Sequence, residues 1–150
     1  MKPVTLGALA LLMIAAASPA ATQAPSAPTG VRGDMLAQFD DAASKLLQLA
    51  EAIPQDKYAW RPAAGVRSVS QVLMHVSGAN YYIVGFTGVK APAGLPQDGE
   101  NTVTDKAHVI EQLRRSVDHV RAAVRGIPDA DLDKPATMFG RPTTNRNVLL

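Results

Sequence analysis

The strongest constraint on the fold of this chain is an amphipathic pattern between residues 104 and 128. Apolar residues recur there at alternating spacings of three and four, at Ile110, Leu113, Val117, Val120, Val124 and Ile127. This spacing places them on one side of an α-helix. Thr104 is the expected N-cap, Gly126 is the expected C-cap, and Pro128 blocks continuation. The apolar side of such a helix must be buried against other elements.

Two earlier stretches show the same spacing. The first is expected to begin with Asp34 as N-cap and to stop at Pro54, with an apolar stripe of Leu36, Phe39, Ala43, Leu46, Ala50 and Ile53. The second runs from Ser68 to about Gly85, and Ser68 and Gln71 can form a capping box at its start. Its predicted stripe consists of Val69, Val72, Leu73, Val76, Asn80 and Ile83. The long connection over 89–103 would let the next helix begin far from where this one ends.

The C-terminal part predicts the beginning of a fourth helix. Residues 129–142 read as irregular, and Thr143 or Thr144 can cap a helix that the apolar residues Val148 to Leu150 have only just begun. Two helical turns cannot cover three long apolar stripes. We therefore expect an all-α, four-helix bundle over residues 34–150 whose fourth helix is mostly missing, as in a fragment or a shortened gene product.

The N-terminal segment predicts export. Lys2 precedes an apolar run from Val4 to Ala17, and Ser18-Pro19-Ala20 offers the small residues that a signal peptidase requires. We expect a signal peptide over 1–20 and an Ala- and Pro-rich linker over 21–33, with a periplasmic or extracellular destination. A retained membrane anchor is the alternative, although the run is short for a bilayer span.

Composition excludes several kinds of function. The 150 residues suffice for one domain, and the formal net charge is only +2, with dispersed basic residues. We therefore expect no nucleic-acid partner. The chain has no cysteine, which excludes a thiolate nucleophile and a zinc–cysteine site.

His75 is the histidine with a plausible chemical role. It lies about 100° from the middle of the predicted stripe of its helix, where it could point into a groove between helices and bind a metal or a substrate. The alternative is a histidine that is hydrogen-bonded within the bundle. His108 and His119 share a face opposite the apolar stripe and lie roughly 16 Å apart, too far for one ion, so we expect solvated surface residues.

Three further side chains could shape a pocket near His75. Trp60 is expected as a hydrophobic lid on the end of the bundle, with stacking on a ligand as the alternative. Asn80 needs a hydrogen-bond partner if it is buried, and Tyr82 lies near the His75 side of the helix, about two turns along.

The run from Tyr58 to Val76, followed by Asn80, resembles the DinB/YfiT-like family. The residues that carry the resemblance are Trp60, Pro62, Gly65, Arg67, Ser68 and His75. The resemblance implies a four-helix bundle with an up-down-down-up path, in which many members are metal-dependent enzymes. It also implies a nickel or zinc site of three histidines. His75 matches the first, and Asn147–Leu150 resembles the lead-in to the fourth-helix motif that holds the other two.

Two functional hypotheses follow. The first is a DinB-type metal-dependent enzyme that acts on a small molecule, of the thiol-transferase or hydrolase type, with His75 as a metal ligand. Because the ligand set is incomplete here, we expect this chain as it stands to be inactive. The alternative is a non-catalytic exported helical binding or assembly module, which could form a homodimer through its uncovered apolar seam.

Overall fold

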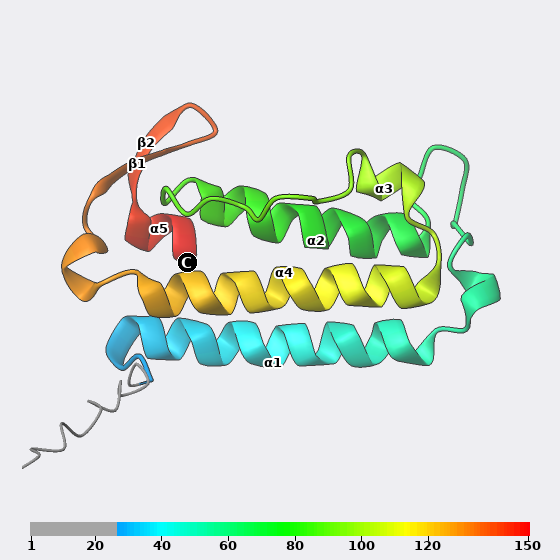
Figure 1. The fold of residues 1–150 in the computed structure, drawn as a ribbon, viewed down its shortest axis with the longest axis horizontal. Coiled ribbons are helices and arrows are strands. Elements are labelled where there is room, and N and C mark those ends of the chain that lie inside the picture. The colour runs from blue at the N-terminus through cyan, green and yellow to red at the C-terminus, as the bar shows by residue number, and fades with distance from the viewer. Residues whose placement is uncertain (1–26) are drawn as a thin grey trace, which may run out of the picture.

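The computed structural model describes residues 27–150, in which three long helices pack side by side (Figure 1). They are α1 (Gly30–Ala52), α2 (Val69–Gly85) and α4 (Lys106–Gly126). The shorter elements are η1 (Gln55–Lys57), α3 (Gly99–Thr102), η2 (Asp129–Asp131), β1 (Pro135–Met138), β2 (Arg141–Thr144) and α5 (Asn145–Leu149). The predicted signal peptide and most of the predicted linker lie outside the described residues.

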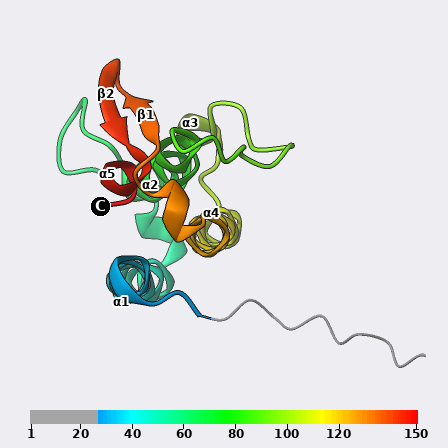
Figure 2. The same cartoon turned by 90° about the vertical axis from the view of Figure 1, so that its left-hand side faces the viewer.

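The three long helices follow the predicted path. In Figure 1, α1 runs in one direction, whereas α2 and α4 both run in the opposite one, because residues 86–105 carry the chain back along the bundle. Viewed along the bundle, the helices occupy the corners of a triangle, and the hairpin projects beyond α2 and α5 (Figure 2). No helix of the described part of the chain is both long and apolar enough to cross a membrane.

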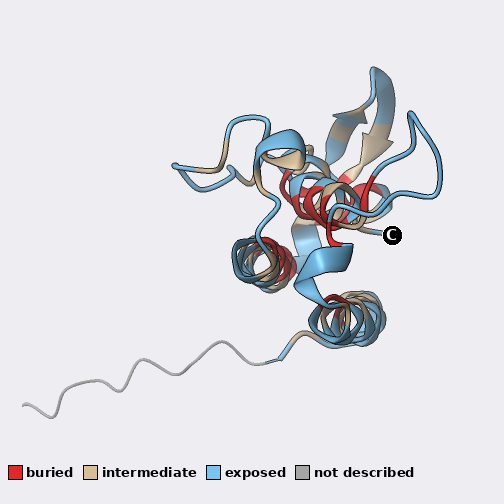
Figure 3. Ribbon diagram, turned by 90° about the vertical axis from the view of Figure 1, so that its right-hand side faces the viewer, coloured by how far each residue is buried: buried red, intermediate tan, exposed pale blue. Residues whose placement is uncertain are grey.

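Burial confirms the stripe predicted for α4. Leu113 is fully buried, and Val117, Val120, Val124 and Ile127 are buried with it, whereas Ile110 is only partly buried and Val109, outside the predicted stripe, is fully buried. α4 packs against both α1 and α2, so the stripe serves two neighbours. Figure 3 shows the buried residues on the sides of the helices that face one another. Each fully buried side chain of this size contributes roughly 1.5–3 kcal/mol of transfer free energy.

The buried face of α2 differs from the predicted stripe. Of the predicted residues only Leu73 is buried, and the face also contains Ser70, Met74, Ser77, Tyr81 and Val84. Two serines occupy it because their hydroxyls find partners: Ser77 donates to the carbonyl of Gln112 at 3.0 Å, and the Ser70 and Ser68 hydroxyls lie 3.1 Å apart. A hydrophobicity pattern cannot identify such residues as buried.

The starts of α1 and α4 also differ from prediction. α1 begins at Gly30 with Thr29 as N-cap, not at Asp34, so residues 30–33 belong to the helix and not to a linker. The reason is tertiary: Arg32 donates to the carbonyl of Ile127 at 2.7 Å, at the end of α4. Asp105, not Thr104, caps α4, accepting from the amide of His108 at 3.0 Å.

A β-hairpin replaces part of the segment that was predicted to be irregular, so the fold is mostly but not entirely helical. β1 and β2 pair antiparallel, with Met138 opposite Arg141. The two residues between them, Phe139 and Gly140, have φ of +51° and +77°, the signs of a type I′ turn. Phe-Gly is not the usual sequence for such a turn, which is why the pattern was missed.

The predicted fourth helix is present only as α5. The hydroxyl of Thr144 accepts from the amide of Asn147 at 3.4 Å, as expected for the N-cap. α5 lies beside one end of α2, and in the part of the chain that the structure describes no further helix runs along α1 and α2 beyond it (Figures 1 and 2).

Candidate functional site

The first turn of α2 fixes the position of the candidate site. Ser68 and Gln71 form the predicted capping box: the Ser68 hydroxyl accepts from the Gln71 amide at 3.3 Å, and the Gln71 side chain accepts from the Ser68 amide at 2.9 Å. Since both orphan donors are satisfied, the helix starts at a defined residue. His75 therefore projects from a rigid part of α2, two turns into the helix.

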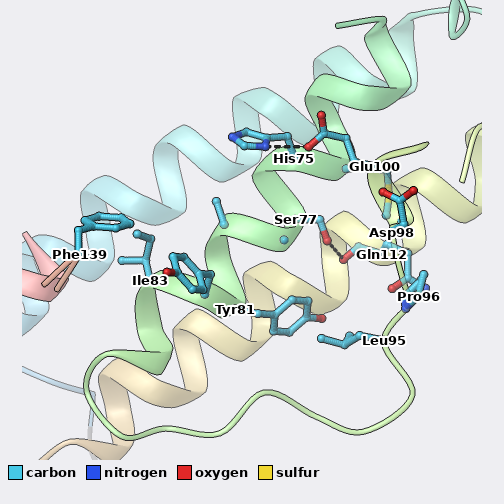
Figure 4. Close-up of a pocket in the computed structure, with 15 residues that line it drawn as sticks. His75, Ser77, Tyr81, Ile83, Leu95, Pro96, Asp98, Glu100, Gln112 and Phe139 are labelled. Carbon is cyan, nitrogen blue, oxygen red and sulfur yellow. Dashed lines mark hydrogen bonds and ion pairs between the residues drawn. The ribbon is translucent and has the colours of Figure 1, made fainter. Parts of the chain in front are cut away.

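His75 belongs to a cluster with Glu100 of α3 and Arg67 of the preceding loop. Its Nδ1 lies 2.9 Å from Oε2 of Glu100 (Figure 4). The other carboxylate oxygen accepts from Nε of Arg67 at 2.6 Å. Nη2 of Arg67 also lies 3.3 Å from the same imidazole nitrogen. The long connection between α2 and α4 thus supplies the carboxylate that holds the histidine.

The charge of Glu100 bears on the tautomer of His75. The hydrogen bond from Arg67, assisted by His75, holds the pKa of the Glu100 carboxyl below its ordinary value of 4.5. An ionised carboxylate only accepts hydrogen bonds, so the 2.9 Å contact selects the tautomer with a proton on Nδ1, in which Nη2 of Arg67 at 3.3 Å is a neighbour and not a hydrogen-bond donor to the ring. Nε2 is then the uncommitted nitrogen, on a side chain that is 52% exposed. It can accept a proton, hydrogen-bond a ligand or bind a metal.

A cavity of about 630 Å³ opens beside this cluster. Its walls come from α2, the connecting segment around α3, Gln112 of α4 and Phe139 at the hairpin tip (Figure 4). Met74, Ile83, Leu95 and Pro96 contribute apolar surface, and His75, Asp98 and Glu100 provide the charged or titratable groups. Mostly apolar walls with a few convergent polar groups are typical of a small-molecule site.

Close backbone packing holds the connecting segment on α2. A Cβ added to Gly99 would lie 3.0 Å from Cε of Met74 and 3.2 Å from Cβ of Pro96, so the end of the Met74 side chain would have to shift to admit a side chain there. Asp98, immediately before, has a left-handed backbone with φ of +53°, a conformation that Asp tolerates better than most residues. These two residues direct the chain across the mouth of the cavity.

Aromatic side chains form the other end of the cavity. The ring of Phe139 lies 5.2 Å from that of Phe86 and 5.9 Å from that of Tyr82. Phe139 reaches α2 from the hairpin tip in spite of its positive φ, an unfavourable backbone for a bulky residue. Strain of this kind persists only where the surrounding packing stabilises it.

Tyr81 and His119 meet under the connecting segment. Tyr81 is only 6% exposed, and its ring centroid lies 5.0 Å from that of His119. The Tyr81 hydroxyl and Nε2 of His119 are buried without a hydrogen-bond partner in the described part of the chain. The prediction that His119 is a solvated surface residue is therefore wrong, because it is partly buried against Tyr81. His108 is exposed, as predicted.

The structure places the other predicted pocket residues, Tyr82, Asn80 and Trp60, at different sites. Tyr82 lines the cavity, as expected, whereas Asn80 donates to Ser116 at 3.0 Å and lines a different, smaller cavity. Trp60 is 59% exposed and is not a lid. Its neighbour Tyr58 closes the bundle end instead, fully buried, with its hydroxyl donating to the carbonyl of Ala50 at 2.6 Å.

The residues present do not complete a metal centre. Residues 27–150 contain no group of three or more His, Cys, Asp or Glu side chains that could hold an ion. His75 and Glu100 supply at most two donors, and the guanidinium of Arg67 lies beside them. A catalytic zinc site normally has three protein ligands, so this donor set does not fit one.

Glu100, Asp98 and Tyr81 were missed by the sequence analysis, because no motif links them to His75.

The Glu100 ion pairs predict a pH-dependent contribution to stability. Because the pKa of Glu100 is lower in the folded chain than its ordinary value of 4.5, its contribution is complete above that value and is lost as the pH falls through the folded-state pKa. We expect Glu100→Gln to lower the free energy of unfolding at pH 7 by less than about 1 kcal/mol, as for partly exposed pairs. The deficit should be smaller at pH 4, below the ordinary value, and should shrink further as the pH falls through the folded-state pKa.

Urea unfolding at the two pH values measures this difference, and Glu111→Gln on the exposed side of α4 is the matched control. A deficit of equal size at both pH values would show that the Glu100 carboxylate does not contribute through its charge.

Comparison with known proteins supports the resemblance seen in the sequence. No curated protein and no solved structure matches the chain. The family model described as the DinB superfamily matches residues 38–150, which include most of α1 and every later element. The resemblance is thereby confirmed, and the chain belongs to the DinB superfamily.

Proposed function

We propose that this chain is a helical domain that binds a small molecule in the cavity between α2 and the connecting segment. The observation that carries the proposal is the cavity itself, whose volume of about 630 Å³ falls in the range of known ligand sites. It is lined by apolar side chains and has an oriented imidazole at its edge.

Each part of the site has a defined contribution to binding. The apolar walls remove the body of the ligand from water. Glu100 holds the His75 ring, so Nε2 is available to accept a hydrogen bond without a further loss of side-chain entropy. Arg67 neutralises Glu100 and so keeps the carboxylate ionised and in place.

Filling the cavity tests this proposal. Gly78 lines it, and a Cβ there would meet no atom within 4 Å, so Gly78→Leu places a side chain in the space without disturbing α2. We expect naphthylethanol, a neutral apolar probe, to shift amide NMR signals of α2 and α3 in the wild type. Its affinity should fall at least about tenfold in Gly78→Leu, since the shared volume is lost.

Gly85→Leu is the matched control, because Gly85 also lies in α2 with open space around it but does not line this cavity. Equal loss of binding in both variants, or no shifts in the wild type, would contradict the proposal.

A metal-dependent enzyme is the second candidate, carried by the free Nε2 of His75. In this hypothesis His75 is one ligand of a nickel or zinc ion in a site that needs further ligands, and the reaction is of the thiol-transferase or hydrolase type that the family resemblance implies. The two donors of the described residues would hold such an ion only weakly, and we derive no catalytic step from them.

This candidate predicts that the purified protein retains about one equivalent of nickel or zinc, because a catalytic ion must be held firmly. His75→Ala should remove it, whereas His108→Ala should not, since His108 is exposed in the first turn of α4, beside Asp105, and does not line the cavity. Elemental analysis measures the metal content. Metal-free protein would eliminate this candidate and leave the binding proposal intact.

We further propose that the chain is exported to the periplasm or the extracellular space. Support comes from Lys2, the apolar run from Val4 to Ala17 and the small residues around Ala20.

We also propose that it has no nucleic-acid partner. Several of its arginines pair with carboxylates and form no basic stripe, as in Arg32–Asp129 and Arg121–Asp40.

Self-association through the groove between α1 and α2 is a further proposal. Leu49 of α1 and Val72 of α2 are exposed. Val72 belongs to the predicted stripe of α2, and Leu49 lies one turn from Leu46 and from Ile53 of the α1 stripe. At the α5 end the same two stripes line an apolar cavity of about 180 Å³. A second copy of the chain would present the same uncharged stripes, as an interface with two-fold symmetry requires.

Sedimentation equilibrium tests this proposal. We expect a wild-type dimer and a monomer for Val72→Glu, because a charge in an apolar interface is costly to bury. Val66→Glu is the matched control: Val66 is 44% exposed, against 45% for Val72, but lies in the loop before α2. A wild-type monomer at about 100 μM, a concentration at which micromolar association would be evident, would contradict the dimer.

A further inference from the structure

Three aromatic side chains meet at the hairpin end of the cavity. Each pair among Tyr82, Phe86 and Phe139 is in contact, with ring centroids 4.9 to 5.9 Å apart and interplanar angles of 48 to 70°. Tilted and edge-to-face arrangements of this kind are the ones that aromatic rings prefer. Two of the three, Tyr82 and Phe139, also line the cavity.

The two lining rings leave much of their surface uncovered. Tyr82 is 60% exposed and Phe139 is 62% exposed, whereas Phe86, which does not line this cavity, is partly buried. A large apolar side chain that is exposed singly needs no explanation, but a contiguous group of them marks an interaction site. Because this group forms a wall of the cavity, the partner that fits it is a molecule small enough to enter.

Phe139 reaches this wall at a conformational cost. It occupies the first turn position of the hairpin with φ of +51°, where asparagine or aspartate is usual. β1 and β2 themselves pack on α5, so it is the side chain at the tip that extends to Tyr82 and Phe86 of α2 and its C-cap. Backbone strain of this kind is characteristic of residues that clamp a ligand.

The floor of the cavity between the rings and His75 is open. His75 and Tyr82 are seven residues apart on α2, so they share a face and are separated by about 10 Å along the helix axis. Gly78 and Ala79 lie between them and line the cavity, and a Cβ on Gly78 would meet no atom within 4 Å. Figure 4 shows Phe139 and Glu100 at opposite ends of this floor. A flat ring system can therefore lie along α2 with one end between the aromatic side chains.

We propose that the ligand carries a planar aromatic group, held between the rings of Tyr82 and Phe139 beside Gly78. This inference rests on the proposed binding function and adds the chemical class of the ligand. Tyr82 and Phe139 determine specificity, since contacts between rings stabilise a complex beyond the apolar area that they bury. An aliphatic group of the same size would gain only the burial.

Two probes of matched size test the preference by amide NMR titration: naphthylethanol and its saturated counterpart, decahydronaphthylethanol. The saturated probe offers at least as much apolar surface, so burial alone predicts equal or tighter binding of that probe. We expect naphthylethanol to bind about twofold to tenfold more tightly, as an aromatic contact implies. Nuclear Overhauser contacts should join its naphthyl protons to the rings of Tyr82 and Phe139.

Phe139→Leu removes one ring but keeps an apolar side chain at the hairpin tip. We expect the affinities for the two probes to become nearly equal in this variant. Tyr82→Leu makes the same test from the exposed side of α2, where the fold does not depend on the hairpin, and should give the same result. Trp60→Leu is the matched control: Trp60 is 59% exposed but lies outside the cavity, so the full preference should remain.

The ratio of the two affinities separates specificity from packing. If Phe139→Leu and Tyr82→Leu weakened both probes by the same factor, the rings would serve only to hold the hairpin on α2, and their role in specificity would be overturned.

The outcomes also separate this inference from the proposed function. Equal affinity for the two probes in the wild type, tighter binding of the saturated probe, or Overhauser contacts that miss both rings would overturn the aromatic preference while the binding function stands. Failure of both probes to bind would overturn the binding function itself.

Discussion

The fold depends on one interaction, the burial of a single apolar face of α4 against two neighbours. Val109 and Leu113 lie in a core cluster with Ala50 of α1 and with Leu73 and Met74 of α2. Without this shared face, α1 and α2 would have little to pack against, because their backbones make few contacts with each other. Polar contacts at the helix ends fix the alignment: Arg32 binds carbonyls at the end of α4, and Lys106 binds the carbonyls of Glu51 and Ile53 at 2.6 and 2.7 Å.

The candidate site is a consequence of the parallel arrangement of α2 and α4. Two parallel helices require a connection that returns along the bundle, and here residues 86–105 form it. That return places α3 over α2, where the missing side chain of Gly99 allows close contact with Met74. The same passage brings Glu100 to His75 and encloses the cavity. The topology that satisfies the core therefore also creates the pocket.

The sequence predicted the helices better than the site. The α4 stripe, the Ser68–Gln71 capping box and the candidate role of His75 were readable, because each depends on residues within a few turns of one another. Glu100 was not, since 25 residues separate it from His75 and no motif joins them. Tyr58 has the role that was predicted for Trp60, because both are aromatic and only packing decides which one is buried. The hairpin was missed because Phe-Gly is an uncommon type I′ turn.

By itself the sequence determined the three long helices, since periodicity and capping are local properties, and its motif spacing indicated the superfamily, whose resemblance implied the path of the helices. Tertiary structure alone decided which face of α2 is buried, because hydroxyls that hydrogen-bond across the helix pair can lie inside, as Ser77 does. It also decided the partner of His75 and the shape of the cavity. These depend on where distant segments meet in space, and that is set by the packing of the whole bundle.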